Sequence, residues 1–145
     1  MRPEDATCQR CDEYWPEAIR RTGAVCLNCA DSTHQTIRRC PVCARKDAPS
    51  EYHHIASKRQ RATFGVRICL NCHAILTQRQ LTAWDPSWRT EHHPVRCIVQ
   101  GMIDFLCLCW ERSPAVAMLH DMLSLLARAS IEIAACLRLT GWDFA

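Results

Sequence analysis

Glycine is scarce in this chain, which has only four among its 145 residues. No glycine-rich loop is available to cradle phosphate groups, and no serine–histidine arrangement suggests acyl transfer. These two absences exclude the usual nucleotide-hydrolase and acyl-transfer chemistries. Because 48% of the residues are hydrophobic, we nevertheless expect the chain to fold.

Long apolar runs are also missing. The stretch Met1–Asp5 lacks the apolar core of a secretory signal. Charged residues interrupt the later apolar stretches before they reach the ~20 residues that a bilayer requires. The sequence therefore predicts a cytoplasmic protein that does not associate with a membrane.

The charge is small overall but unevenly distributed. The net charge is +3, yet residues 1–79 hold thirteen Lys or Arg against eight Asp or Glu, while residues 80–145 hold five against seven. The basic half includes four side chains predicted to contact the phosphates of DNA: Lys58, Arg59, Arg61 and Arg67. The alternative is that they belong to a solvated loop.

Cysteine, by contrast, is abundant. Eight of the twelve cysteines form four Cys-x-x-Cys pairs in the first half of the chain. In a reducing compartment such pairs are metal ligands more often than disulfides. The first two pairs predict a closed structural zinc site that stabilises a small N-terminal module: Cys8, Cys11, Cys26 and Cys29.

The last two pairs lie next to a predicted strand and a predicted helix. Alternating Phe64, Val66 and Ile68 indicate a strand, and good helix formers follow Cys72. A knuckle, a hairpin and a helix together make a treble clef, in which His73 points toward the hairpin. The predicted ligands of its structural zinc are Cys40, Cys43, Cys69 and Cys72.

The rest of the chain is expected to be helical. We predict one helix over residues 95–111 and another from a Ser113–Pro114 cap to about Thr140, with Gly141 closing it. The second helix has an apolar seam with the spacing of packed helices: Ala115, Leu119, Met122, Leu126, Ala129, Ile133 and Cys136. This seam fits a helical hairpin or a homodimer. Trp84 and Trp88 are expected to cover the junction with the preceding segment.

The predicted fold class is therefore α+β, in three parts. Residues 1–35 form an N-terminal zinc-knuckle module, residues 36–82 form a zinc-stabilised core, and residues 83–145 form a C-terminal helical hairpin. The cysteines of the helical part, Cys97, Cys107, Cys109 and Cys136, are expected to be small buried apolar residues.

Between Cys40 and about Thr77, the chain resembles the HNH endonucleases, in their cysteine-bearing branch. The likeness rests on Cys-x-x-Cys, then His53-His54-Ile55, then Cys-x-x-Cys-His73. It implies a ββα-metal (His-Me finger) core and hydrolysis of DNA phosphodiester bonds with Mg²⁺ or another divalent ion. It also implies that His53 and His73 bind this ion and that His54 is the general base. The N-terminal cysteines loosely resemble a module of endonuclease VII-like proteins.

Two positions depart from that family. The central asparagine is absent, since the only asparagines are Asn28 and Asn71, and Thr77 stands where a further histidine ligand is common. An alternative function is a non-catalytic zinc module that binds nucleic acid. Another is a RING-like interaction module, in which the first cysteine pair shares zinc with the third and the second with the fourth. DNA preference, nicking or double-strand cutting, the catalytic metal and the oligomeric state stay open.

Overall fold

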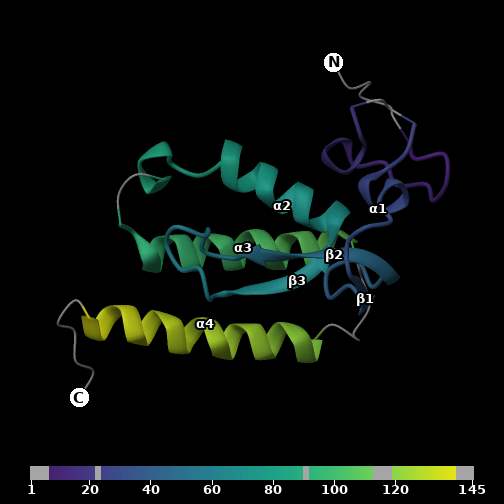
Figure 1. Ribbon diagram of the computed structural model, residues 1–145. Coiled ribbons are helices and arrows are strands. Elements are labelled where there is room, and N and C mark those ends of the chain that lie inside the picture. Colours follow the sequence, from purple (N-terminus) through teal and green to yellow (C-terminus); the bar gives the residue numbers. More distant parts are fainter. Residues whose placement is uncertain (1–6, 22–23, 90–91, 113–118, 140–145) are drawn as a thin grey trace.

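The structure is a computed structural model that describes residues 7–21, 24–89, 92–112 and 119–139 (Figure 1). It confirms a mixed α+β chain. The elements, in order, are η1 (Pro16–Ala18), α1 (Leu27–Ala30), β1 (Thr36–Arg39), β2 (Lys46–His54), β3 (Gly65–Cys69), α2 (Leu70–Thr82), η2 (Pro86–Arg89), α3 (Pro94–Arg112) and α4 (Leu119–Leu139).

The three strands form one antiparallel sheet in the order β1-β2-β3. A tight turn containing Cys40 and Cys43 joins β1 to β2, and Ala44 adopts a positive φ of 58° there. A ten-residue loop, 55–64, joins β2 to β3. This arrangement places His53 and His54 at the end of β2, opposite Val66 and Gly65 of β3.

Helix α2 follows β3 without an intervening loop, as the sequence predicted. It begins at Leu70, slightly earlier than expected, because Cys69 already has extended backbone at the N-cap. The predicted strand is confirmed but begins at Gly65, after the buried Phe64. A side chain at Gly65 would meet the carbonyl oxygen of His53 at 2.2 Å, so only glycine allows the two strands to approach here.

The two long helices, α3 and α4, pack against each other and against the part of the chain that contains the sheet (Figure 1). The bounds of α3 agree with the helix predicted over residues 95–111. The Ser113–Pro114 cap and Gly141, predicted to flank the second helix, lie outside the described residues. The predicted seam is wrong at Leu126, which is 40% exposed, because Leu125 is turned into the core with Ala129 and Cys136 instead. No described helix has the length and apolar character needed to span a membrane.

One apolar core joins the predicted 36–82 and 83–145 segments. It includes Ile55, Phe64 and Ile68 from the first, and Ile98 and Phe105 from the second. Helix α3 comes so close to the loop after His54 that a side chain at Gly101 would lie 1.9 Å from the carbonyl oxygen of Ile55. Trp84 is buried at this junction, as expected, and donates to Asp104 at 2.7 Å.

Candidate functional site

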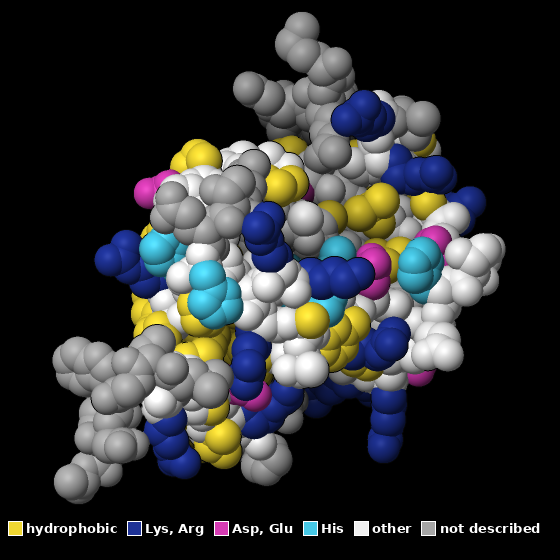
Figure 2. Space-filling model, turned by 60° about the vertical axis from the view of Figure 1, so that its left-hand side comes forward, with side chains coloured by type: hydrophobic (Ala, Val, Ile, Leu, Met, Phe, Trp, Pro, Cys, Tyr) yellow, Lys and Arg dark blue, Asp and Glu magenta, His cyan; other side chains and the backbone are white. Residues whose placement is uncertain are grey.

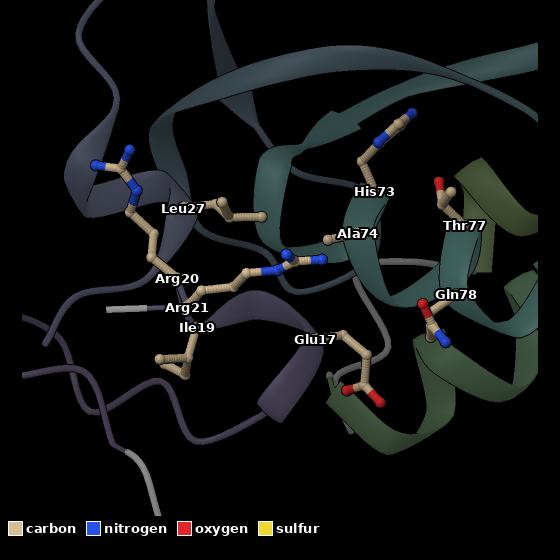
Figure 3. Close-up of a pocket in the computed structure, with 9 residues that line it drawn as sticks. All are labelled: Glu17, Ile19, Arg20, Arg21, Leu27, His73, Ala74, Thr77 and Gln78. Atoms are coloured by element: carbon tan, nitrogen blue, oxygen red, sulfur yellow. The ribbon is translucent and has the colours of Figure 1, made fainter. Parts of the chain in front are cut away.

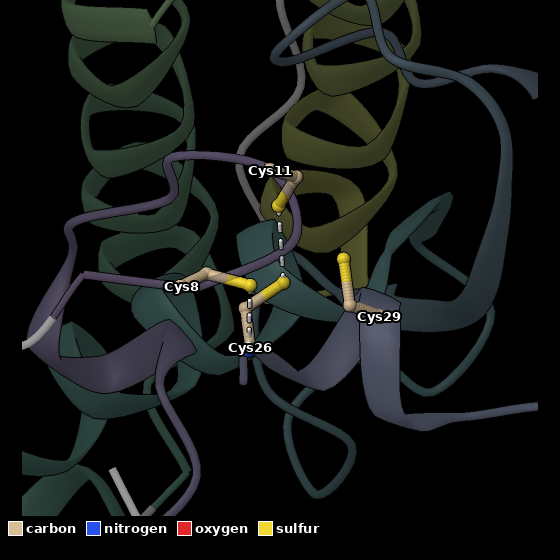
Figure 4. A group of neighbouring side chains, drawn as sticks. All are labelled: Cys8, Cys11, Cys26 and Cys29. Carbon is tan, nitrogen blue, oxygen red and sulfur yellow. Dashed lines mark hydrogen bonds between the residues drawn. The ribbon is translucent and has the colours of Figure 1, made fainter. Parts of the chain in front are cut away.

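The first four cysteines converge on one point (Figure 4). All their sulfur atoms lie within 4.8 Å of one another, and those of Cys11 and Cys26 are 3.5 Å apart. Tetrahedral zinc with bonds of ~2.3 Å requires sulfur atoms about 3.8 Å apart. The backbone N–H of Cys26 also donates to the sulfur of Cys8 at 3.2 Å, as expected for a thiolate ligand. The cluster thus fits a structural zinc ion.

The second cluster is built from the turn between β1 and β2 and from the start of α2. Its members, Cys40, Cys43, Cys69 and Cys72, again have all sulfurs within 4.8 Å, with 3.7 Å between Cys43 and Cys69. Each cluster combines consecutive pairs. The crossed pairing of the RING-like alternative is therefore wrong: the first pair shares its site with the second, not with the third.

A reciprocal pair of asparagines joins the two zinc modules. Asn28 and Asn71 occupy the same place in two Cys-Leu-Asn-Cys segments, at the starts of α1 and α2. The N–H of Asn28 donates to the side-chain oxygen of Asn71 at 2.8 Å, and the N–H of Asn71 donates to that of Asn28 at 3.2 Å. Each asparagine thus satisfies a free N–H at the start of the other helix.

A buried ion pair extends this junction to α3. Arg112 donates to both carboxylate oxygens of Glu13, at 3.0 and 2.5 Å, and the amide of Asn71 donates to the same carboxylate at 2.8 Å. Burial alone would raise the pKa of Glu13, but Arg112 and Asn71 outweigh it and hold the pKa below its usual value. The N-terminal module is thereby fixed to both α2 and α3.

His53 and His73 meet on the side of β2 that faces α2. Their rings are 5.3 Å apart and nearly perpendicular, and Nδ1 of His73 lies 3.5 Å from a carboxylate oxygen of Glu51. Burial, together with the charges of His73 and His54, lowers the pKa of His53 to about 3. Burial lowers the pKa of His73 as well, although Glu51 opposes it. Both imidazoles are therefore in the neutral form that binds metal ions at neutral pH.

Gln80 of α2 holds the backbone that follows these histidines. Its side-chain nitrogen donates to the carbonyl oxygens of His54 at 3.0 Å and Ile55 at 3.1 Å, and it lies 3.3 Å from Nε2 of His53. Sequence reasoning missed this residue. Nothing in its spacing distinguishes it from other polar residues on a helix, because its partners are backbone atoms about 25 residues away.

His54 points to the opposite face of β2, because β2 is regular to its end. Its Nδ1 lies 2.9 Å from the carbonyl oxygen of Ala62, and its ring packs edge-on against Tyr52. An Nδ1–H that donates to this carbonyl leaves Nε2 with a free lone pair, as a general base requires. No bulge in β2 turns the two histidines to one side.

A groove of about 510 Å³ exposes His54 to solvent. Its lining includes Glu51, Arg67 and His34, and Nδ1 of His34 is 2.9 Å from the carboxylate of Asp31. Sequence reasoning missed His34. The only available signal was the Asp31-x-x-His34 spacing, which is common in turns.

The predicted phosphate contacts have different surroundings. Arg67 lines the His54 groove, and Lys58 and Arg59 are exposed on the 55–64 loop. Arg61 donates to Glu132 of α4 at 2.6 Å, so its charge is already balanced by the protein. Figure 2 shows histidine side chains on one face among basic and acidic ones.

The histidines form a less complete metal site than the cysteines. Among the described residues, only the two cysteine clusters bring three or more ligand atoms within 4.8 Å of one another. Thr77, one turn after His73 on α2, offers no imidazole. His53, His73 and Glu51 are thus neighbours whose ligand atoms must move closer together to share an ion.

Comparison with other proteins finds no match. No family model, curated protein or solved structure is significantly similar to this chain. The function must therefore be argued from the side chains described above.

Burial of His53 makes stability depend on pH. Unfolded histidine takes up a proton near pH 6.5, whereas folded His53 stays neutral down to about pH 3, so stability falls as the pH falls between these values. Without added divalent ions, this histidine lowers the free energy of unfolding by about 1.4 kcal/mol when the pH falls from about 7.5 to about 5.5. We expect the His53→Asn variant to lose correspondingly less stability over that interval. Urea unfolding at the two pH values measures the difference, and equal losses in both proteins would contradict the prediction.

Proposed function

We propose that this protein is an HNH-like metal-dependent endonuclease that hydrolyses DNA phosphodiester bonds. The observation that supports this best is the contact between the rings of His53 and His73, 5.3 Å apart, on a strand and a helix anchored by one cysteine cluster. The order of turn, hairpin and helix around that cluster supports a treble clef of the ββα-metal kind.

His53 and His73 would hold the proposed catalytic ion, with Glu51 as a third ligand in the absence of a histidine at position 77. Neutral imidazoles and a carboxylate suit a divalent cation, and a shift of the Glu51 side chain, which is half-exposed, brings the donors together. Bound there, Mg²⁺ or a similar ion supplies positive charge for the phosphoryl and leaving oxygens.

His54 is the proposed general base. It lies on the opposite face of β2 from His53 but shares its groove with Glu51, so its Nε2 would take a proton from a water beside that carboxylate, while the carbonyl of Ala62 holds the ring through Nδ1–H. Arg67, in the same groove, is placed to bind a phosphate of the substrate. Gln80 keeps the backbone after His54 in place.

The incomplete set of ligands favours a second candidate, a zinc-stabilised module that binds nucleic acid without cutting it. In that case Arg67, Lys58 and Arg59 bind phosphates and the histidines have no catalytic role. The two candidates differ in what an added divalent ion does.

Nicking of supercoiled plasmid, titrated with Mg²⁺, Mn²⁺ and Ni²⁺, distinguishes them. We expect cutting that requires added metal, and at least a hundredfold slower cutting by His73→Ala, because loss of a ligand weakens metal binding. The two structural zinc ions should remain in both proteins. Unimpaired binding of plasmid with no cutting under any metal would favour the second candidate.

A further inference from the structure

A second pocket opens on the other side of His73, between the N-terminal zinc module and α2 (Figure 3). Its volume is about 510 Å³, and its polar lining includes Glu17, Arg20 and Arg21 from the module and His73 and Gln78 from α2. We call it the arginine pocket. Nothing in the sequence resemblance assigns a role to it.

The side chains of the pocket differ in direction. In Figure 3 the guanidinium of Arg21 extends into the pocket beside Ala74, on the side of His73, whereas that of Arg20 points outward. One carboxylate oxygen of Glu17 is buried and has no hydrogen-bond partner in the described part of the chain. Figure 3 shows this carboxylate directed away from Arg21 and His73, so Glu17 takes no part in the proposed contact.

The pocket is held in a fixed place relative to His73. Ile19, just before the arginines, forms a bridge with the zinc ligand Cys26, and the N–H of Arg20 donates to Val25 at 3.1 Å. The reciprocal Asn28–Asn71 bonds then fix the module to α2. The backbone just before Arg21 is thereby held in place, and its exposed side chain is accessible to a ligand.

We infer that the arginine pocket is a phosphate subsite of the nucleic-acid substrate. Arg21 binds a backbone phosphate next to the one at His53 and His73. The inference rests on the proposed function for the position of the cleaved bond. Since Arg67 and His54 line the groove on the other side of Glu51, one strand crosses the site from Arg67 past His73 to Arg21.

Binding of a fluorescent DNA duplex to the full chain, measured over a series of salt concentrations, tests this inference. A His54→Ala background without added divalent ions prevents cutting. We expect Arg21→Ala to weaken binding several-fold and to lower the slope of log K against log salt by about 1. The control Arg138→Ala removes the same charge from the last turn of α4 and should change neither quantity. An unchanged salt slope for Arg21→Ala would overturn the phosphate contact.

The inference and the proposed function fail in different ways. Metal-dependent cutting by a protein that binds DNA equally well with and without Arg21 would leave the nuclease intact and remove the subsite. Binding that depends on Arg21, without any cutting, would support the subsite and contradict the nuclease. Two bound zinc ions in each variant exclude unfolding of the N-terminal module as the cause.

Discussion

Replacing Cys40 with serine is expected to unfold most of the chain, whereas replacing Cys8 should release only the N-terminal module. The two clusters differ in what surrounds them. Cys40 belongs to the main core, which contains residues of β2, β3, α2, α3 and α4, whereas the buried apolar cluster around Cys8 contains, among the described residues, only Ile19 and Cys26 besides. Structural zinc contributes ~10–16 kcal/mol in small peptides, which is comparable to the whole stability of a domain.

Zinc analysis together with thermal unfolding, followed by circular dichroism, checks this prediction. We expect the Cys8→Ser variant to bind one zinc ion and to keep the cooperative transition of the main core at a somewhat lower temperature, since Glu13 and Asn28 lose their places. Cys40→Ser should lack a cooperative transition. Cys107→Ser, at an exposed cysteine outside both clusters, is the matched control. A cooperative Cys40→Ser protein with the parent's melting temperature would show that the second cluster does not stabilise the fold.

Replacing His54 with alanine is expected to slow plasmid cutting by about 10²–10⁴-fold, the usual contribution of a general base. The loss should leave the fold intact, because the ring is half-exposed and its one hydrogen bond within the described part of the chain runs to the carbonyl oxygen of Ala62 on a loop. Zinc content and DNA affinity should also match those of the parent, since neither the cysteines nor the basic side chains are altered.

Single-turnover cutting rates at saturating metal measure this effect without interference from metal affinity. The control is His92→Ala, an exposed histidine that lines neither the His54 groove nor the arginine pocket. Full activity of His54→Ala would contradict the assignment of the base, and equal losses in the His54 and His92 variants would point to a general effect of removing surface histidines.

The sequence predicted those parts of the site that depend on local spacing. Cys-x-x-Cys turns close over a metal within a few residues, so the eight ligands were evident, and the alternating apolar residues before Cys69 identified β3. The seam of α4 was misplaced at Leu126, because neighbouring rows of a helix have the same spacing and only the position of α3 decides between Leu125 and Leu126.

By itself, the sequence determined the four Cys-x-x-Cys pairs, the α+β class and the pair of long helices, since each depends on residues that are close in the chain. Only the tertiary structure decided which cysteine pairs share a site, that Asn28 and Asn71 cap each other's helices, and that Gln80 holds the backbone after His54. It also decided that Arg21 lies beside His73. The physical reason is that these contacts join segments 15 or more residues apart, and hydrogen bonds to backbone atoms leave no signature in the identity of the partner.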